Sequence, residues 1–455
     1  MKKDMNGDPL IGELADFIEK SPTAYHGVEQ MAERLEAAGF AALNEGDHWR
    51  FATGGKYYVT RNGSALIAFR LPKGRFGGFQ IVASHGDSPI FKLKPAPEMA
   101  TAGDQVRLNV ELYGGALLSP WFDRPLSVAG RVLVREGDTL TSRLVNLDRD
   151  LCLIPSLAIH MDREANKGHA WNVQKDLLPL YGQGDCEPVL AAAARELGVA
   201  PEAIAGSDLY VYNRDGLRRW GAHGEFISGP RLDDLQCAFA SLTGILQAEP
   251  TERVAVHCCF DNEEVGSGTK QGAAGTFLAD TLSRIADGLG KVRVDYHRVL
   301  ADSFMLSADN AHGVHPNAAD KADPVNRPRL NGGVVIKHSA NQKYTTDGVS
   351  AAVCRMLCEA EGVPCQDFAN RSDMAGGSTL GNISTTQVSL NTADIGLAQL
   401  AMHSPFETAG AADTGYLAAL CRRFYETSFT LKADGRYGLR LKEAEEADDA
   451  DDAEE

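Results

Sequence analysis

Short apolar runs recur along the chain and are separated by segments that have the periodicity of a helix. The runs that predict buried strands lie at residues 64–70, 78–85, 253–260, 303–308 and 394–402. A segment that begins at Leu232 places apolar residues at spacings of three and four, which predicts a helix, and residues 9–40 show this pattern twice. Apolar strands that alternate with helices favour an α/β fold with a mixed, mainly parallel sheet flanked by helices.

The middle of the chain has a different pattern. Residues 105–115 alternate strictly between polar and apolar positions, and the segments 127–136 and 208–213 are also typical of strands. Several glycine-containing turns separate these segments, which suits an inserted β-rich domain with one exposed face. The domains predicted in this way are residues 97–220 for the insert, and residues 1–96 together with 221–432 for the interrupted first domain.

Composition and charge narrow the possible partners. The chain has 455 residues, of which 44% are hydrophobic and 24% charged, as in globular proteins with a large core. Of the net charge of −17, residues 441–455 carry −8, because they contain nine acids and one lysine. We expect this segment to be a disordered acidic tail. Because neither the tail nor the body has a basic patch, we expect no nucleic-acid partner and no membrane partner.

The cysteines and the first residues of the chain bear on its location. The nine cysteines lack C-x-x-C spacing, and Cys258 and Cys259 lie in an apolar run, so we expect buried, reduced thiols. Acidic side chains interrupt residues 1–20, which therefore lack the continuous apolar segment of a signal peptide. Together these features predict a cytoplasmic protein.

Three carboxylates follow one apolar strand within four positions, at Asp261, Glu263 and Glu264. Unpaired charge is costly to bury, and a divalent metal ion would neutralise it. In open α/β sheets, ligands bind at the carboxyl ends of the strands. We therefore expect further metal-binding residues at the ends of the other predicted elements.

Metal-binding residue types do occur there. They are His85 and Asp87 around the end of the run 78–85, Asp233 at the predicted helix start, Asp309 after the run 303–308, and His403 after the run 394–402. Asp87 lies two positions after His85, so it can point the same way and accept the other imidazole N–H. Two histidines with several carboxylates suit zinc, manganese or cobalt, and one shared aspartate can hold two ions.

The adjacent pair Glu263 and Glu264 offers two roles. Neighbouring side chains diverge in an extended segment, so one glutamate can ligate a metal while the other takes a proton from the attacking water. Each candidate also has a structural alternative, since a lone histidine at a strand end is usually not a ligand and Asp233 could cap a helix. From the spacing alone, a dinuclear metal site and a set of structural residues both remain open.

Five motifs that contain these residues follow one another along the chain. They are ASHGDSP (83–89), RLDDL (231–235), FDNEEVGS (260–267), SADNAHGVHPN (307–317) and AQLAMHS (398–404). This series resembles the aspartyl aminopeptidase family of dinuclear zinc exopeptidases, and the resemblance covers nearly the whole chain from Ser21 to His403. The chain departs from the family pattern at Gly86, at Asp234 and in the segment SPFETAG (404–410).

The resemblance implies the fold of a zinc exopeptidase with two divalent metal ions per subunit. Zinc is the expected metal, and manganese or cobalt could replace it. His85 and Asp309 would complete one metal site. Glu264 and His403 would complete the other, and Asp233 would bridge the two.

The same resemblance implies roles in catalysis and substrate binding. Glu263 would be the general base and later the proton donor to the leaving amine, while Asp87 would orient the histidine two residues before it. Lys337 and Tyr344 would face the side chain of the substrate's first residue. His160, in the inserted domain, would enter the active site of a neighbouring subunit, because this domain forms the dimer contact in similar enzymes. The implied assembly is a homododecamer built from dimers.

The resemblance therefore implies a zinc-dependent aminopeptidase that removes a single residue, preferably aspartate or glutamate, from peptides with a free N-terminus. Its implied mechanism is a water molecule activated by two metals, with Glu263 as the general base. Two alternatives remain: a deacylase or carboxypeptidase that uses the same metals on other amide bonds, and an assembly or cargo scaffold with a vestigial site. A blocked N-terminus separates the first alternative from an aminopeptidase, and a scaffold has no physical need for Glu263.

Overall fold

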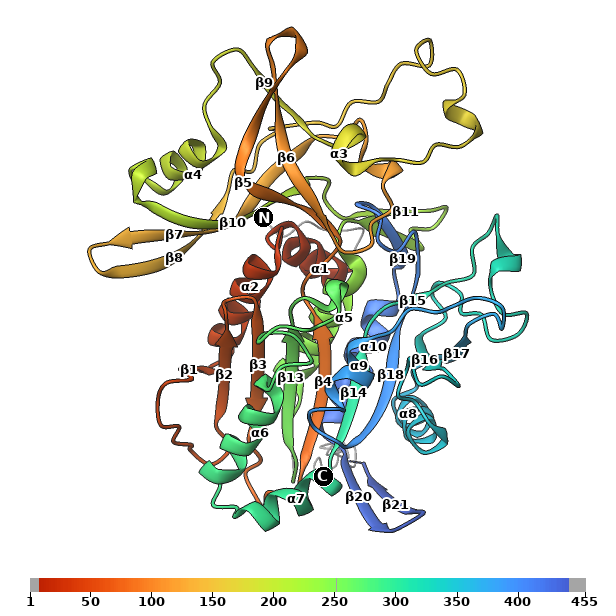
Figure 1. The fold of residues 1–455 in the computed structure, drawn as a ribbon. Coiled ribbons are helices and arrows are strands. Elements are labelled where there is room, and N and C mark those ends of the chain that lie inside the picture. The colour runs from red at the N-terminus through yellow and green to blue at the C-terminus, as the bar shows by residue number, and fades with distance from the viewer. Residues whose placement is uncertain (1–7, 251, 442–455) are drawn as a thin grey trace, which may run out of the picture.

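The structure, a computed structural model, describes residues 8–250 and 252–441 and consists of two large β-sheets with covering helices (Figure 1). Apart from residue 441, the expected acidic tail lies outside the described residues. Within the described part of the chain, the larger sheet contains 13 strands. They are β1 (Ala41–Leu43), β2 (Lys56–Arg61), β3 (Ala65–Arg70), β4 (Phe79–His85), β11 (Arg218–Trp220), β12 (Phe226–Gly229), β13 (Val254–Phe260), β14 (Phe304–Ala308), β15 (Ala311–His312), β16 (Val334–His338), β17 (Cys365–Ala369), β18 (Asn391–Leu400) and β19 (Glu407–Gly410).

The four central strands of the larger sheet run parallel to one another. β4 pairs in parallel with both β13 and β14, and β14 pairs in parallel with β18. The neighbouring strands β3, β16 and β19 pair antiparallel to this centre. The predicted mixed sheet is thus confirmed, and its parallel centre brings the carboxyl ends of four strands to one edge.

Helices cover both faces of the larger sheet because its buried strands alternate between two apolar clusters. Val82 and Leu306 point into one cluster, whereas their neighbours Ile81 and Met305 point into the other, as the period of two in a strand requires. The first cluster is covered by α1 (Pro9–Glu19), α2 (Ala24–Ala37), α5 (Leu232–Gln247), α8 (Gly348–Glu361) and α10 (Asp413–Tyr425), and the second by α6 (Phe277–Gly288), α7 (Arg293–Ala301) and α9 (Leu380–Ser384).

The smaller sheet is antiparallel and has its own apolar core around Phe91 and Trp121. Figure 1 shows it above the edge at which the central strands of the larger sheet end. Its strand order is β8-β7-β10-β5-β6-β9. The bounds are β5 (Ile90–Thr101), β6 (Gln105–Tyr113), β7 (Leu126–Glu136), β8 (Thr139–Asn146), β9 (Leu180–Gln183) and β10 (Ile204–Asn213), with the helices α3 (Val173–Asp176) and α4 (Val189–Leu197) beside it.

The bounds of the smaller sheet bear on the expected domain limits. The sheet begins at Ile90, before the expected start of the insert at residue 97, and β11 already belongs to the larger sheet. A separate hairpin of β20 (Ser428–Ala433) and β21 (Arg436–Arg440) follows α10. The division into domains remains a prediction. Among the described residues, no helix is both long enough and apolar enough to cross a membrane.

Candidate metal centre and active site

The parallel centre of the sheet brings the predicted site residues together at its carboxyl edge. His85 is the last residue of β4, and Asp309 directly follows the neighbouring strand β14. Glu263 and Glu264 follow β13, the other neighbour of β4. His403 lies three residues beyond β18, in a loop with a left-handed backbone (φ 66°). Residues that are far apart in the sequence therefore meet around one point.

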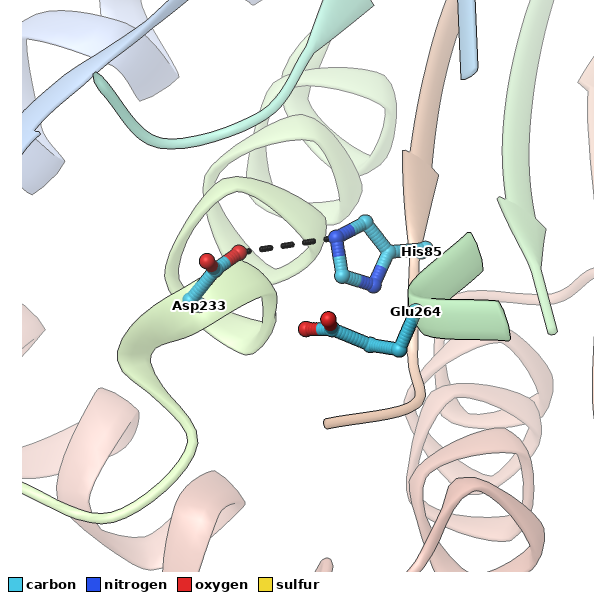
Figure 2. A group of neighbouring side chains, drawn as sticks. All are labelled: His85, Asp233 and Glu264. Carbon is cyan, nitrogen blue, oxygen red and sulfur yellow. Dashed lines mark ion pairs between the residues drawn. The ribbon is translucent and has the colours of Figure 1, made fainter. Parts of the chain in front are cut away.

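Asp233 lies at the centre of this group, between the two histidines. It lies in the first turn of α5, whose N-cap is Arg231, and its Oδ1 atom has no hydrogen-bond partner. Its Oδ1 atom is 3.4 Å from Nε2 of His85, and its Oδ2 atom is 3.6 Å from Nε2 of His403. Figure 2 shows the carboxylate facing the His85 ring, with Glu264 beside them. The helix-cap alternative for Asp233 is therefore not supported.

The remaining two predicted ligands each lie near one of the histidines. Nε2 of His85 is 3.8 Å from Oδ1 of Asp309, and Nε2 of His403 is 3.4 Å from Oε2 of Glu264. All five predicted ligands are thus within a few ångströms of a neighbour in the group. These distances agree with the expected pairs, His85 with Asp309 and Glu264 with His403. The number of ions that these residues hold remains a prediction.

The donor set fits divalent metal ions. Oδ1 of Asp233 and Oε1 of Glu264 are buried and have no hydrogen-bond partner, which is costly for a carboxylate unless a cation satisfies it. Two groups of three side chains have ligand atoms within 4.8 Å of one another: His85, Asp233 and Glu264, and His85, Asp234 and Asp309. The second group shows that Asp234, one of the departures from the family pattern, also faces this centre. Imidazole with several carboxylates is a donor set that zinc accepts.

Burial and charge shift the pKa values of the central groups. Burial lowers the pKa of His85, but the carboxylates of Asp233 and Asp309 outweigh it and hold this pKa well above the usual value. Burial raises the pKa of Glu263 to about 8, with His85 opposing the rise and Asp309 adding to it. A carboxylate whose pKa lies near neutrality is suited to take up and release a proton.

The turn that carries Glu263 and Glu264 differs from the expected extended segment. The two residues lie in one turn of 3-10 helix, η5 (Glu263–Val265), that follows Asn262. Their N–H groups donate to the two oxygens of Asp87 at 3.1 Å each. Asp87 therefore fixes the backbone of both glutamates. The imidazole Nδ1 of His85 is nearer to the main-chain oxygen of Asp87, at 3.1 Å, than to its carboxylate Oδ1, at 3.4 Å.

A cavity of about 280 Å³ opens onto the predicted metal ligands, and two predicted substrate-binding residues line it. Lys337, on β16, is only 2% exposed. Its Nζ atom lies 3.4 Å from Oδ2 of Asp309 and 5.4 Å from the ring centroid of Tyr344. His160, the third predicted residue, is exposed on the loop that follows Ile154 and is not among the described residues that line this cavity.

Two residues that the motifs did not single out hold the centre in place. Glu407, at the start of β19, accepts the N–H of Asp233 at 2.9 Å and the N–H of His403 at 2.8 Å. Tyr113 donates its hydroxyl to Asp87 at 2.6 Å. The sequence signal for Glu407 is its place in SPFETAG, where the chain departs from the family pattern.

Comparison with known proteins agrees with this geometry. The family model described as aminopeptidase I zinc metalloprotease (M18) matches residues 17–425. The chain belongs to the M18 family. As a member, it is a zinc-dependent aminopeptidase, a hydrolase of the exopeptidase class, and the resemblance inferred from its motifs is confirmed.

Individual known proteins match this chain over most of their length. A probable M18 family aminopeptidase 2 from Clostridium acetobutylicum is 46% identical over 421 residues, which cover 90% of this chain and 97% of that protein. The structure of the Ape4 and Nbr1 complex contains a chain with a TM-score of 0.88 and 35% identity, with 91% of this chain and 85% of that chain covered. The mApe1 dodecamer of S. cerevisiae has a TM-score of 0.80 and 30% identity, with 91% and 97% covered.

Proposed function

We propose that this M18 enzyme is a two-metal aminopeptidase that releases one N-terminal residue, preferably aspartate or glutamate, from peptides with a free N-terminus. The observation that carries the proposal is the meeting of Asp233 with four other proposed ligands, with Glu263 beside them at the cavity. His85 and Asp309 would hold one metal. Glu264 and His403 would hold the other.

The proposed mechanism combines two metal ions with two carboxylate side chains of this chain, Glu263 and Asp87. Two zinc ions, or manganese or cobalt in their place, would polarise the scissile carbonyl and acidify a water molecule. Glu263 takes the proton of the attacking water and later gives it to the leaving amine. Burial raises the pKa of Glu263, which makes its carboxylate a stronger base for this proton. Asp87 keeps Glu263 in place through the backbone hydrogen bond.

The proposed preference for an acidic first residue rests on Lys337. It is the only lysine or arginine among the described residues that line the cavity. A buried ammonium group offers a charged hydrogen bond to a substrate carboxylate, and Tyr344 borders the same space. A peptide with a neutral first residue has no carboxylate to offer the Lys337 ammonium group, so it would not gain this hydrogen bond.

We also propose a homo-oligomer, a dodecamer built from dimers, in which the insert at residues 97–220 makes the dimer contact. The S. cerevisiae relative mApe1 is a dodecamer. On the loop that carries His160, Leu157 and Met161 are 58% and 75% exposed, and exposed apolar groups of this kind favour a protein contact. His160 would reach the site of a neighbouring subunit. The cysteines are free thiols, which supports a reducing, cytoplasmic location.

The test compares peptides that begin with Asp, Glu or Leu, each with a free and with an acetylated N-terminus, after zinc has been supplied to the purified protein. We expect release of the first residue from the free peptides only, with the acidic residues preferred. Cleavage of the acetylated peptides at the same rate would contradict an aminopeptidase and favour a deacylase. No cleavage by the fully metallated protein would favour a scaffold.

A further inference from the structure

The segment that leaves the smaller sheet after β6 touches the metal centre from two sides. The hydroxyl of Tyr113, the last residue of β6, lies 2.6 Å from Oδ2 of Asp87. Two residues later, the main-chain oxygen of Gly115 lies 2.8 Å from Nδ1 of His403. A proton on Nδ1 that is donated to this oxygen leaves Nε2 of His403 free to face Glu264. Residues 113–115 thus contact Asp87, which lies beside His85, and also His403, a proposed ligand of the other metal.

This close approach depends on Gly114. Its backbone has a φ of +76°, which favours glycine. A Cβ atom at this position would lie 3.1 Å from Cβ of Glu264. The segment therefore packs directly against the turn that carries the glutamates.

The hydrogen bonds around Tyr113 have a defined direction. The side-chain oxygen of Asn262 accepts from Thr269 at 2.8 Å and from Gln271 at 2.9 Å. Its amide nitrogen must then face Tyr113, to which it donates at 2.9 Å. Because the Tyr113 oxygen accepts this bond, its own proton is available for Asp87.

Asp87, whose orientation the Tyr113 hydroxyl holds, contacts residues proposed for both metal sites. Its two oxygens accept the N–H groups of Glu263 and Glu264, and its Oδ1 atom lies 3.4 Å from Nδ1 of His85. Asp87 is 5% exposed, so solvent does not replace a lost partner easily. A rotation of this one carboxylate would disturb the proposed base and a proposed ligand of each metal.

We propose that Tyr113 is a positioning residue of the metal centre, and that its hydroxyl holds Asp87 in the orientation that fixes His85, Glu263 and Glu264. This inference rests on the proposed function, because it takes His85 and Glu264 as metal ligands. The smaller sheet would then help to position the catalytic centre through Tyr113, in addition to any role in assembly.

The variant Tyr113→Phe removes only the hydroxyl. Its ring can stay in edge contact with Tyr210, at 6.3 Å between centroids. The matched control is Tyr212→Phe, because the Tyr212 hydroxyl also donates to a side-chain oxygen, that of Asn146 at 2.7 Å, but within the smaller sheet. Loss of a residue that contacts a ligand directly typically weakens metal affinity by about 10- to 100-fold. Tyr113 lies one contact further out, behind Asp87, so we expect a smaller effect, of at least about fivefold.

The experiment measures zinc dissociation constants by competition with a chromophoric chelator, so it needs no peptidase activity. We expect the constant to rise at least fivefold in Tyr113→Phe and to stay within twofold of wild type in Tyr212→Phe. With saturating zinc, the kcat of Tyr113→Phe should remain reduced while KM stays within twofold, because Tyr113 does not line the substrate cavity. A rise of less than fivefold, or an equal rise in both variants, overturns the inference. Failure of the wild type to bind zinc would instead overturn the proposed function.

Discussion

Replacement of Lys337 by methionine tests how the enzyme chooses its substrate. Methionine keeps most of the length and apolar surface of the side chain but removes the ammonium group. Lys337 is 2% exposed and lines the cavity beside the proposed metal ligands. A substrate carboxylate that meets it is therefore removed from most of the water that would screen the interaction.

The size of the effect follows from this burial. A hydrogen bond to a charged group contributes about 1.5–3 kcal/mol, which corresponds to a loss of roughly 10- to 150-fold in kcat/KM for peptides that begin with aspartate. Peptides that begin with leucine never use this bond, so their kcat/KM should change by less than about threefold. The ratio of the two rates isolates the interaction from any general loss of activity.

The assay measures kcat/KM for paired peptides that differ only in the first residue, together with the zinc content of each preparation. Lys343→Met is the matched control, because Lys343 is an exposed lysine six positions along the chain and does not line the cavity. Equal zinc content in the variants excludes an indirect effect through Asp309, which lies 3.4 Å from Lys337. An unchanged preference for aspartate over leucine in Lys337→Met would refute the assignment.

Two further predictions concern Asp233, the proposed bridging ligand, and His26, a buried histidine. Asp233→Asn should lower the zinc content from the proposed two to below one per subunit, because each carboxylate oxygen faces a different imidazole. Two equivalents retained after dialysis would contradict the proposed bridging role. Burial lowers the pKa of His26 to about 4, whereas its value in the unfolded chain is 6.5. As the pH falls from 6.5 towards 4, the imidazole is therefore protonated in the unfolded state only, and the folded state becomes less stable. At pH 5 the free energy of unfolding is lower by about 2 kcal/mol for this reason. Between pH 7 and pH 5, the thermal midpoint of His26→Gln should therefore fall less than that of the wild type or of the exposed control His48→Gln. Equal falls in all three proteins would contradict this role of His26.

The strand ends that build the site are predictable because their signals are local. An apolar run followed by a polar metal-binding residue marks both His85 and Asp309 without any knowledge of the fold. Parallel pairing of β4 with β14 then places these ends side by side. The same reasoning finds Asp233, because the helical periodicity begins beside it.

The supporting contacts are not predictable in this way, because they join distant segments. Tyr113 meets Asp87 across 26 positions, and Glu407 meets Asp233 across 174. No periodicity in either segment indicates these hydrogen bonds. The turn at Glu263 is also fixed from outside, by Asp87, which explains why the expected extended backbone was wrong.

The most direct test of the proposed mechanism is the rate at which Glu263→Gln releases the first residue from a peptide that begins with aspartate, measured with its zinc content. The amide cannot act as the base, and loss of a general base typically costs about 100- to 10,000-fold. We predict a fall in kcat of at least about 100-fold while the zinc content stays at the wild-type value. A kcat close to that of wild type in fully metallated Glu263→Gln would contradict the assignment of Glu263 as the general base.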